Sequence, residues 1–73
     1  MMVKSPENVR FGQRIAELRK NAQFSQETLA LKSGINRTYM GAIERGEKTP
    51  SLLIINKVAQ AFGLTLKQLF DYE

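Results

Sequence analysis

The chain has 73 residues, with 11 Lys and Arg against 7 Asp and Glu, and it contains neither Cys nor His. This composition excludes disulfides, Cys/His zinc sites and the nucleophile triads that depend on imidazole. The length fits one domain, and a chain this short buries only about 60% of its unfolded surface, so the fold must be compact. The net charge of +4 favours an acidic partner only weakly, because many basic proteins bind nothing acidic.

No segment is typical of a membrane protein. The longest apolar run, residues 52–55, is far shorter than a membrane span. The first residues carry no apolar stretch of the kind found in signal peptides. We therefore expect a cytoplasmic protein that contacts no membrane.

Capping residues and glycines predict two helices in the first half of the chain. The sequence Ser-Pro-Glu at residues 5–7 starts the first helix, because Ser caps, Pro suits the first helical position and an acid faces the positive helix end. That helix should end near Asn21. Ser25 caps a second helix that runs to about Ser33, where Gly34 ends it.

Three further helices are expected in the second half. Asn36 caps a helix that ends at residues 45–46, and a fourth helix runs from about residue 51 to residue 62. Thr65 and Gln68 form the capping box of a last short helix. No strand-like alternation of useful length occurs, so the domain is predicted to be all-α. The inward face of the fourth helix is expected to carry Leu52, Ile55, Val58, Ala59 and Phe62.

The most informative stretch is residues 26–45. Two short helices flank a three-residue spacer with Gly34 at its centre, and this geometry suits the steep crossing of a helix-turn-helix. Ala30 lies four residues before Gly34, where a small side chain lets the two helices approach closely. The buried contact between the two helices, called the inner seam below, is expected to be formed by Leu29, Ile35, Met40 and Ile43.

This chain resembles the Cro/phage-repressor (XRE) type of helix-turn-helix in the sequences QETLALKSGI and NRTYMGAIERG, and the likeness covers nearly the whole chain. Residues 37–39 together with residues 43–45, on so short a chain, are most similar to the controller proteins of restriction–modification systems. Other stand-alone regulators share these residues. The sequence departs from the family pattern at the apolar residues 53–54 and at Gly41, which is expected on the outer face of its helix.

The resemblance implies a compact five-helix, lambda-repressor-like domain that works as a sequence-specific, dimeric transcription regulator. Its recognition helix, residues 36–45, would lie in the major groove of double-stranded DNA. The two copies would place these helices about 34 Å apart on a near-palindromic operator. No cofactor and no metal are implied.

Four residues of the expected recognition helix are candidates for base contact. Arg37 could bond O6 and N7 of one guanine through its planar guanidinium, although an Arg in any exposed helix is commonly just solvated. Thr38 could reach a base or a phosphate, or only support the first helical turn. Gly41 and Ala42 would allow close approach to DNA or to a base methyl, and Gly41 costs about 1 kcal/mol of helix stability relative to Ala.

Phosphate contacts are expected on three helices and on the loop that follows the third. By the resemblance, Gln26 bonds a phosphate and steadies Arg37; otherwise it is a polar helix start. Tyr39 either holds a phosphate through its hydroxyl or packs partly buried against the first helix. The cations Arg45 and Lys48 flank the loop after the recognition helix, and a further candidate on the first helix is Arg14.

Acidic residues complicate this surface. Glu44 and Glu47 would dilute the positive field around the loop. Arg19 is expected to be solvated or paired with Glu17. Glu27 has two interpretations: the resemblance implies a contact with RNA polymerase, as in some activators of the family, and the alternative is an acid stabilised by the helix N-terminus.

The last eight residues contain more large apolar side chains than a short terminal helix can bury. An exposed apolar patch usually marks an interface, and the resemblance implies two-fold pairing through residues 60–73. We expect Leu66 and Phe70 to lie partly in the core. Leu69 and Tyr72 are expected to contribute to the dimer interface, and Leu66 and Phe70 are candidates for the same interface through the parts that the core leaves exposed.

The apolar and acidic residues of the chain bear on two other classes of function, a protein-interaction module and an enzyme. A protein-interaction module, such as an antitoxin that sequesters a partner, is favoured by surplus apolar residues at Leu53, Ile54 and Leu69. An enzyme is not expected, because Glu44 and Glu47 are the only close carboxylate pair in a potentially polar loop region and so small a helical domain leaves little room for a pocket.

Overall fold

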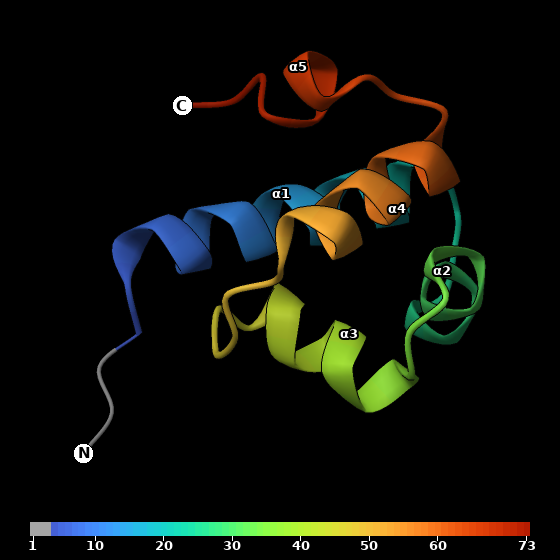
Figure 1. Cartoon of the computed structure of the whole chain (residues 1–73), viewed down its shortest axis with the longest axis horizontal. Helices are drawn as coiled ribbons and strands as arrows, with labels where there is room; N and C mark the ends of the chain where they lie inside the picture. The colour runs from blue at the N-terminus through green and yellow to red at the C-terminus, as the bar shows by residue number, and fades with distance from the viewer. Residues whose placement is uncertain (1–3) are drawn as a thin grey trace.

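The computed structural model describes residues 4–73, which form five helices and no strand (Figure 1). This confirms the all-α prediction. The bounds of the helices agree closely with the expected ones. They are α1 Pro6–Asn21, α2 Gln26–Ser33, α3 Arg37–Glu44, α4 Leu52–Phe62 and α5 Leu66–Leu69.

Local side-chain chemistry explains why each helix begins where it does. At each start, a side-chain oxygen accepts a hydrogen bond from the backbone N–H three residues later, which satisfies an amide that has no partner within its helix. Gln68 completes the predicted capping box of α5, because its side chain also bonds the backbone of the capping residue. The five capping residues are Ser5, Ser25, Asn36, Ser51 and Thr65.

The core lies between the first four helices, where α3 packs on α1 and α2, and α2 packs on α4. Its buried residues come from all five helices and are Phe11, Ile15, Leu29, Ala30, Met40, Ile43, Val58, Ala59 and Leu69. The expectation that Leu52 faces inward is wrong: its side chain is 71% exposed, because it begins α4 at the end of the packed face. The other four residues expected on that face are buried or pack against the core.

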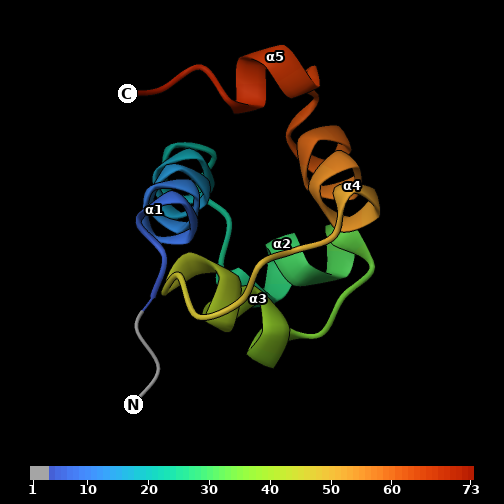
Figure 2. The ribbon, with the colours of Figure 1, turned by 60° about the vertical axis from the view of Figure 1, so that its left-hand side comes forward.

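The helices α3 and α5 lie at opposite ends of the molecule in both views (Figures 1 and 2). The helix-turn-helix and the C-terminal segment therefore present separate surfaces. No helix among the described residues has the length and apolar character needed to cross a membrane.

Candidate nucleic-acid interface

The turn between α2 and α3 has the expected helix-turn-helix geometry. Gly34 ends α2 in the left-handed conformation, with φ of 71°, and the backbone N–H of Ile35 donates to the carbonyl of Ala30 at 3.0 Å. Ala30 is buried where the helices meet. Leu29, Met40 and Ile43 are also buried and Ile35 is partly buried, so the predicted inner seam is confirmed.

The first turn of α3 projects into solvent. Asn36 caps it by accepting from the backbone N–H of Tyr39 at 2.7 Å, and the next two side chains, Arg37 and Thr38, are exposed. No ion pair within the described part of the chain engages Arg37. The helix therefore offers a free guanidinium and a hydroxyl at its N-terminal end. Tyr39 is partly buried and packs against the core, which restricts its ring.

The second half of α3 is not the outer surface that was expected. Gly41 is buried, and Ala42 is only 7% exposed because it faces the core. A Cβ at Gly41 would lie 2.9 Å from Nη1 of Arg45 and 3.5 Å from Oε1 of Gln26. The prediction that Gly41 lies on the outer face is therefore wrong, since these two side chains cover it. Gly41 and Ala42 gain no support as base contacts.

A buried ion pair fixes α3 against α1. Nε and Nη2 of Arg19 donate to the two carboxylate oxygens of Glu44 at 2.7 and 3.1 Å, with side chains 14% and 5% exposed. Arg19 also donates to the carbonyl of Phe24, and Gln26 donates to Glu44 Oε1 at 3.0 Å. The expectation that Arg19 is solvated or paired with Glu17 is wrong, because packing of α1 on α3 brings Glu44 closer. One carboxylate thus joins α1, α2 and α3.

Close backbone contact adds to this attachment. Gly12 of α1 is buried directly against the end of α3, where a Cβ would lie 2.5 Å from the carbonyl oxygen of Glu44 and still closer to that of Ile43. Only a residue without a side chain allows this approach. The position of α3 is therefore set by backbone contact as well as by the ion pair.

The C-terminal end of α3 carries a cluster of charges. Nε and Nη2 of Arg45 donate to Oε2 and Oε1 of Glu47, each at 3.0 Å, and Lys4 Nζ lies 4.0 Å from Glu47 Oε2. The hydrogen bonds with Arg45 lower the pKa of Glu47, and the same bonds raise the pKa of Arg45. Lys48 is exposed beside this pair. The negative charge of the Glu47 carboxylate is thus balanced by the cations beside it.

Arg14 lies away from this surface. Its Nε and Nη2 donate to the carbonyls of Leu69 and Gln68 at 3.0 and 2.8 Å, and its guanidinium lies 6.0 Å from the ring centroid of Tyr72. The expected phosphate contact by Arg14 is therefore contradicted, since its donors bind the end of α5. Glu27, by contrast, is exposed in the first turn of α2, as both of its interpretations require.

The C-terminal segment buries one of its four candidate interface residues and leaves the other three at least partly exposed. Leu69 is completely buried, because α5 turns it toward the core, whereas Leu66 and Phe70 are 37% and 45% exposed. The expectation that Leu69 contributes to the interface is therefore wrong, whereas the partial exposure of Leu66 and Phe70 agrees with the expected division between core and surface. The Phe70 ring stacks on Phe11 with centroids 5.5 Å apart, and Tyr72 is partly buried beside it.

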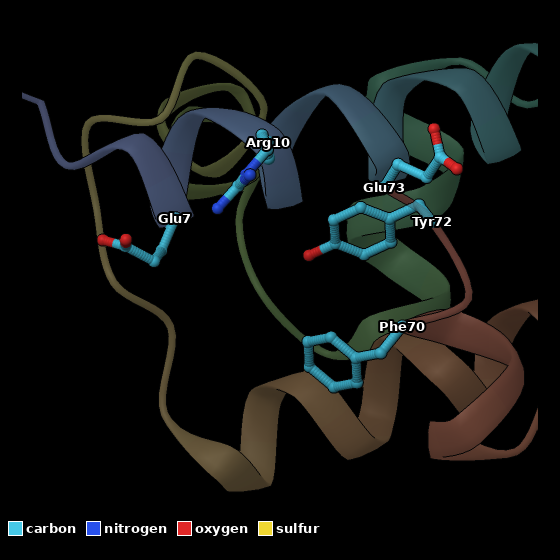
Figure 3. A pocket seen from close by; sticks show the side chains of 5 residues that line it. All are labelled: Glu7, Arg10, Phe70, Tyr72 and Glu73. Carbon is cyan, nitrogen blue, oxygen red and sulfur yellow. The ribbon is translucent and has the colours of Figure 1, made fainter.

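A pocket opens between α1 and this segment. It has a volume of about 260 Å³, and the rings of Phe70 and Tyr72 face Glu7 and Arg10 across it (Figure 3). Elsewhere on the surface, Leu31 is 80% and Leu53 is 63% exposed. The two apolar residues expected at an interface or in the core differ here: Ile54 packs against the core, whereas Leu53 does not.

Comparison with known proteins identifies the family. The sequence profile described as helix-turn-helix (HTH_3) matches residues 15–69. Control protein C.MunI of Mycoplasma sp is 38% identical over 64 residues, which make up 86% of each chain.

Two solved structures support the same assignment. The restriction-modification controller protein C.AhdI from Aeromonas hydrophila superposes with a TM-score of 0.87 and 45% identity, over 90% of this chain and 100% of that one. The biofilm regulator SinR, solved in complex with DNA, superposes with a TM-score of 0.76 and 34% identity, over 84% of this chain and 98% of that one. The chain therefore belongs to the HTH_3 family of helix-turn-helix transcriptional regulators.

Proposed function

We propose that this chain is a sequence-specific, dimeric DNA-binding transcription regulator that acts as the controller of a restriction–modification system. The observation that carries the proposal is the first turn of α3, which leaves Arg37 and Thr38 free in solvent on a helix held rigidly at its other end. A side chain that reads base edges must be both accessible and fixed in position. The relationship to C.MunI and C.AhdI supports the controller assignment.

The residues of the interface have distinct roles. Arg37 bonds a guanine edge, and Thr38 contacts a neighbouring base or phosphate. Contacts to phosphate come from Gln26 at the start of α2, Tyr39 in the first turn of α3, and Arg45 and Lys48 after the end of α3. These contacts set register and give most of the sequence-independent affinity. The relative SinR, solved with DNA, supports this mode of binding.

Dimerisation through the C-terminal segment completes the operator-binding unit. The exposed apolar surfaces of Leu66, Phe70 and Tyr72 lie at the opposite end of the molecule from α3, so pairing there leaves the recognition helices free. A two-fold dimer matches a near-palindromic site with half-sites about 34 Å apart. Glu27, exposed on α2, would be available for a contact with RNA polymerase. Such a regulator acts in the cytoplasm, at the nucleoid of a bacterium or on phage DNA.

Replacement of Arg37 tests the role of the first turn. The operator for this test comes from selection of bound sequences out of a random DNA pool. Arg37→Ala is expected to weaken operator binding by about 5- to 150-fold, the equivalent of 1–3 kcal/mol of base discrimination, while the fold is retained. Lys20→Ala, which removes the same charge from an exposed site on α1, is the matched control. Equal operator affinity of wild type and Arg37→Ala at one salt concentration would contradict the assignment.

A second candidate function has one observation in its favour. Leu31 and Leu53 are exposed large apolar side chains outside the C-terminal segment, as a module that sequesters a protein partner would require. Sedimentation and a gel shift on random duplex DNA separate the two functions. A stable monomer without DNA affinity would favour the interaction module over the regulator. The family provides no support for an enzyme, because its members are transcription regulators.

A further inference from the structure

Arg45 is the cation closest to the end of the recognition helix, and its guanidinium is already occupied. Nε and Nη2, which together form one bidentate edge, both donate to the Glu47 carboxylate at 3.0 Å. A phosphate binds the same edge with the same geometry, because carboxylate and phosphate oxygens are interchangeable partners of the Arg fork. In the free protein, Glu47 therefore takes the place that a DNA phosphate would fill.

The third nitrogen of Arg45 is also directed toward the protein. Nη1 lies 2.9 Å from the position that a Cβ of Gly41 would occupy, so the guanidinium packs against the backbone of α3 at this glycine and covers it. Gly41 is unfavourable in the middle of a helix. Its presence makes room for Arg45 to fold back, and the folded-back conformation brings Arg45 to Glu47.

Glu47 also attracts the other cations near this end of α3. Lys4 Nζ lies 4.0 Å from its carboxylate, and both Lys4 and Lys48 help to lower its pKa. The side chains of Arg45 and Glu47 are 55% and 41% exposed, so the pair can open at small cost when a stronger partner arrives. It is thus a contact that exchanges, unlike the buried pair of Arg19 and Glu44.

We propose that Glu47 is an internal competitor for DNA phosphate, which holds Arg45 against α3 in the free protein and thereby limits sequence-independent binding to DNA. The inference rests on the proposed DNA-binding function and adds a regulating contact to its interface. Binding requires Arg45 to exchange the Glu47 carboxylate for a backbone phosphate. Because phosphate contacts carry no sequence information, Glu47 lowers affinity for all duplexes alike. The effect limits how much of the protein is held at the many non-specific sites of a genome.

Glu47→Gln tests the proposal, with binding to a random 24-base-pair duplex measured by fluorescence anisotropy over a series of salt concentrations. The variant should bind about two- to fivefold more tightly than wild type, the range that corresponds to loss of an exposed ion pair. The slope of log affinity against log salt should steepen by up to about 0.9, since the variant has no released carboxylate whose uptake of a cation offsets the counterion that the phosphate loses. The matched control is Glu17→Gln, which makes the same change in net charge on α1, where Glu17 meets only Arg14 at 3.9 Å.

A double-mutant cycle shows whether the effect passes through Arg45. The gain from Glu47→Gln should shrink when it is measured in an Arg45→Gln background, because the competitor then has no guanidinium to hold. A gain no larger than that of Glu17→Gln, an equal gain in both backgrounds, or a loss of affinity would overturn the proposal. If wild type binds no duplex at low salt, the proposed function itself fails, whereas wild-type binding with no effect at Glu47 overturns only this inference.

Discussion

Replacing Gly12 with Ala should destabilise the domain, although Ala is the better helix former. In α1 the substitution gains about 1 kcal/mol of helix propensity. The new Cβ, however, would lie 2.5 Å from the carbonyl oxygen and 2.8 Å from the carbonyl carbon of Glu44. These are backbone atoms of α3 and cannot rotate away, so the helices must separate at a cost near the upper end of the usual 1–3 kcal/mol for overpacking.

The expected net loss is therefore about 2 kcal/mol, from a total stability of about 4–11 kcal/mol for a domain of this length. It should lower Tm by about 8–16 °C. Because the separation moves the end of the recognition helix, operator affinity should fall as well. Urea unfolding monitored by circular dichroism gives the free energy of unfolding directly.

Gly41→Ala is the matched control, since it places the same methyl group in the middle of another helix. The Cβ there would meet Nη1 of Arg45, the mobile end of an exposed side chain, which can swing away. That variant should gain stability, by up to about 1 kcal/mol. Two results would refute the inference that backbone contact at Gly12 fixes α3. One is a free energy of unfolding for Gly12→Ala equal to that of wild type, and the other is a change in this free energy in the same direction for both variants.

Three further predictions address other contacts. Arg19→Met should cost about 3–5 kcal/mol in urea unfolding, because it leaves the Glu44 carboxylate buried without its cation; a cost below 1 kcal/mol would contradict the role of this pair. Phe70→Glu should convert the proposed dimer to a folded monomer in sedimentation equilibrium, and an unchanged dimer would place the interface elsewhere. Arg45→Gln should raise the pKa of Glu47 toward its ordinary value in an NMR titration of the carboxyl carbon, and no change would mean that the pair is absent in solution. Because folding lowers that pKa, the pair stabilises the fold above about pH 4.3, and this contribution disappears as the pH falls through the folded-state pKa.

The helix boundaries could be predicted because their causes are local. A capping side chain such as Asn36 acts on an amide three residues away, and Gly34 ends a helix by its own backbone conformation. Both effects are contained within a few consecutive residues. The helix-turn-helix spacing is equally local, so α2, the turn and α3 could be located before the fold was known.

The predictions that are wrong concern contacts between segments that are far apart in the sequence. Arg14 and Arg19 look alike on α1, yet one binds the end of α5 and the other a carboxylate of α3, at sequence separations of 55 and 25 residues. Nothing in the local pattern distinguishes these partners. Leu69 is buried instead of lying at the interface, and the sequence could not predict this because a four-residue helix has too few turns to define a face by periodicity.

The contact at Gly12 is not among the sequence-based predictions. A small residue among larger apolar ones on a core-facing helix nevertheless indicates that another backbone comes close. Gly41 is predicted to lie on the outer face and to allow close approach to DNA, but Arg45 and Gln26 cover it. Its missing side chain makes room for Arg45, and that contact depends on how the chain turns after α3. Both glycines show that a missing Cβ predicts a close neighbour without identifying it.

Selection of bound sequences from a random DNA pool tests the central claim most directly. The dimer with recognition helices on α3 predicts enrichment of a near-palindromic site whose half-sites are centred about 10 base pairs apart and contain a guanine that Arg37 contacts. Repeating the selection with Arg37→Ala should relax the preference at that guanine while the spacing is kept. Failure of the wild-type protein to enrich any sequence would contradict the account.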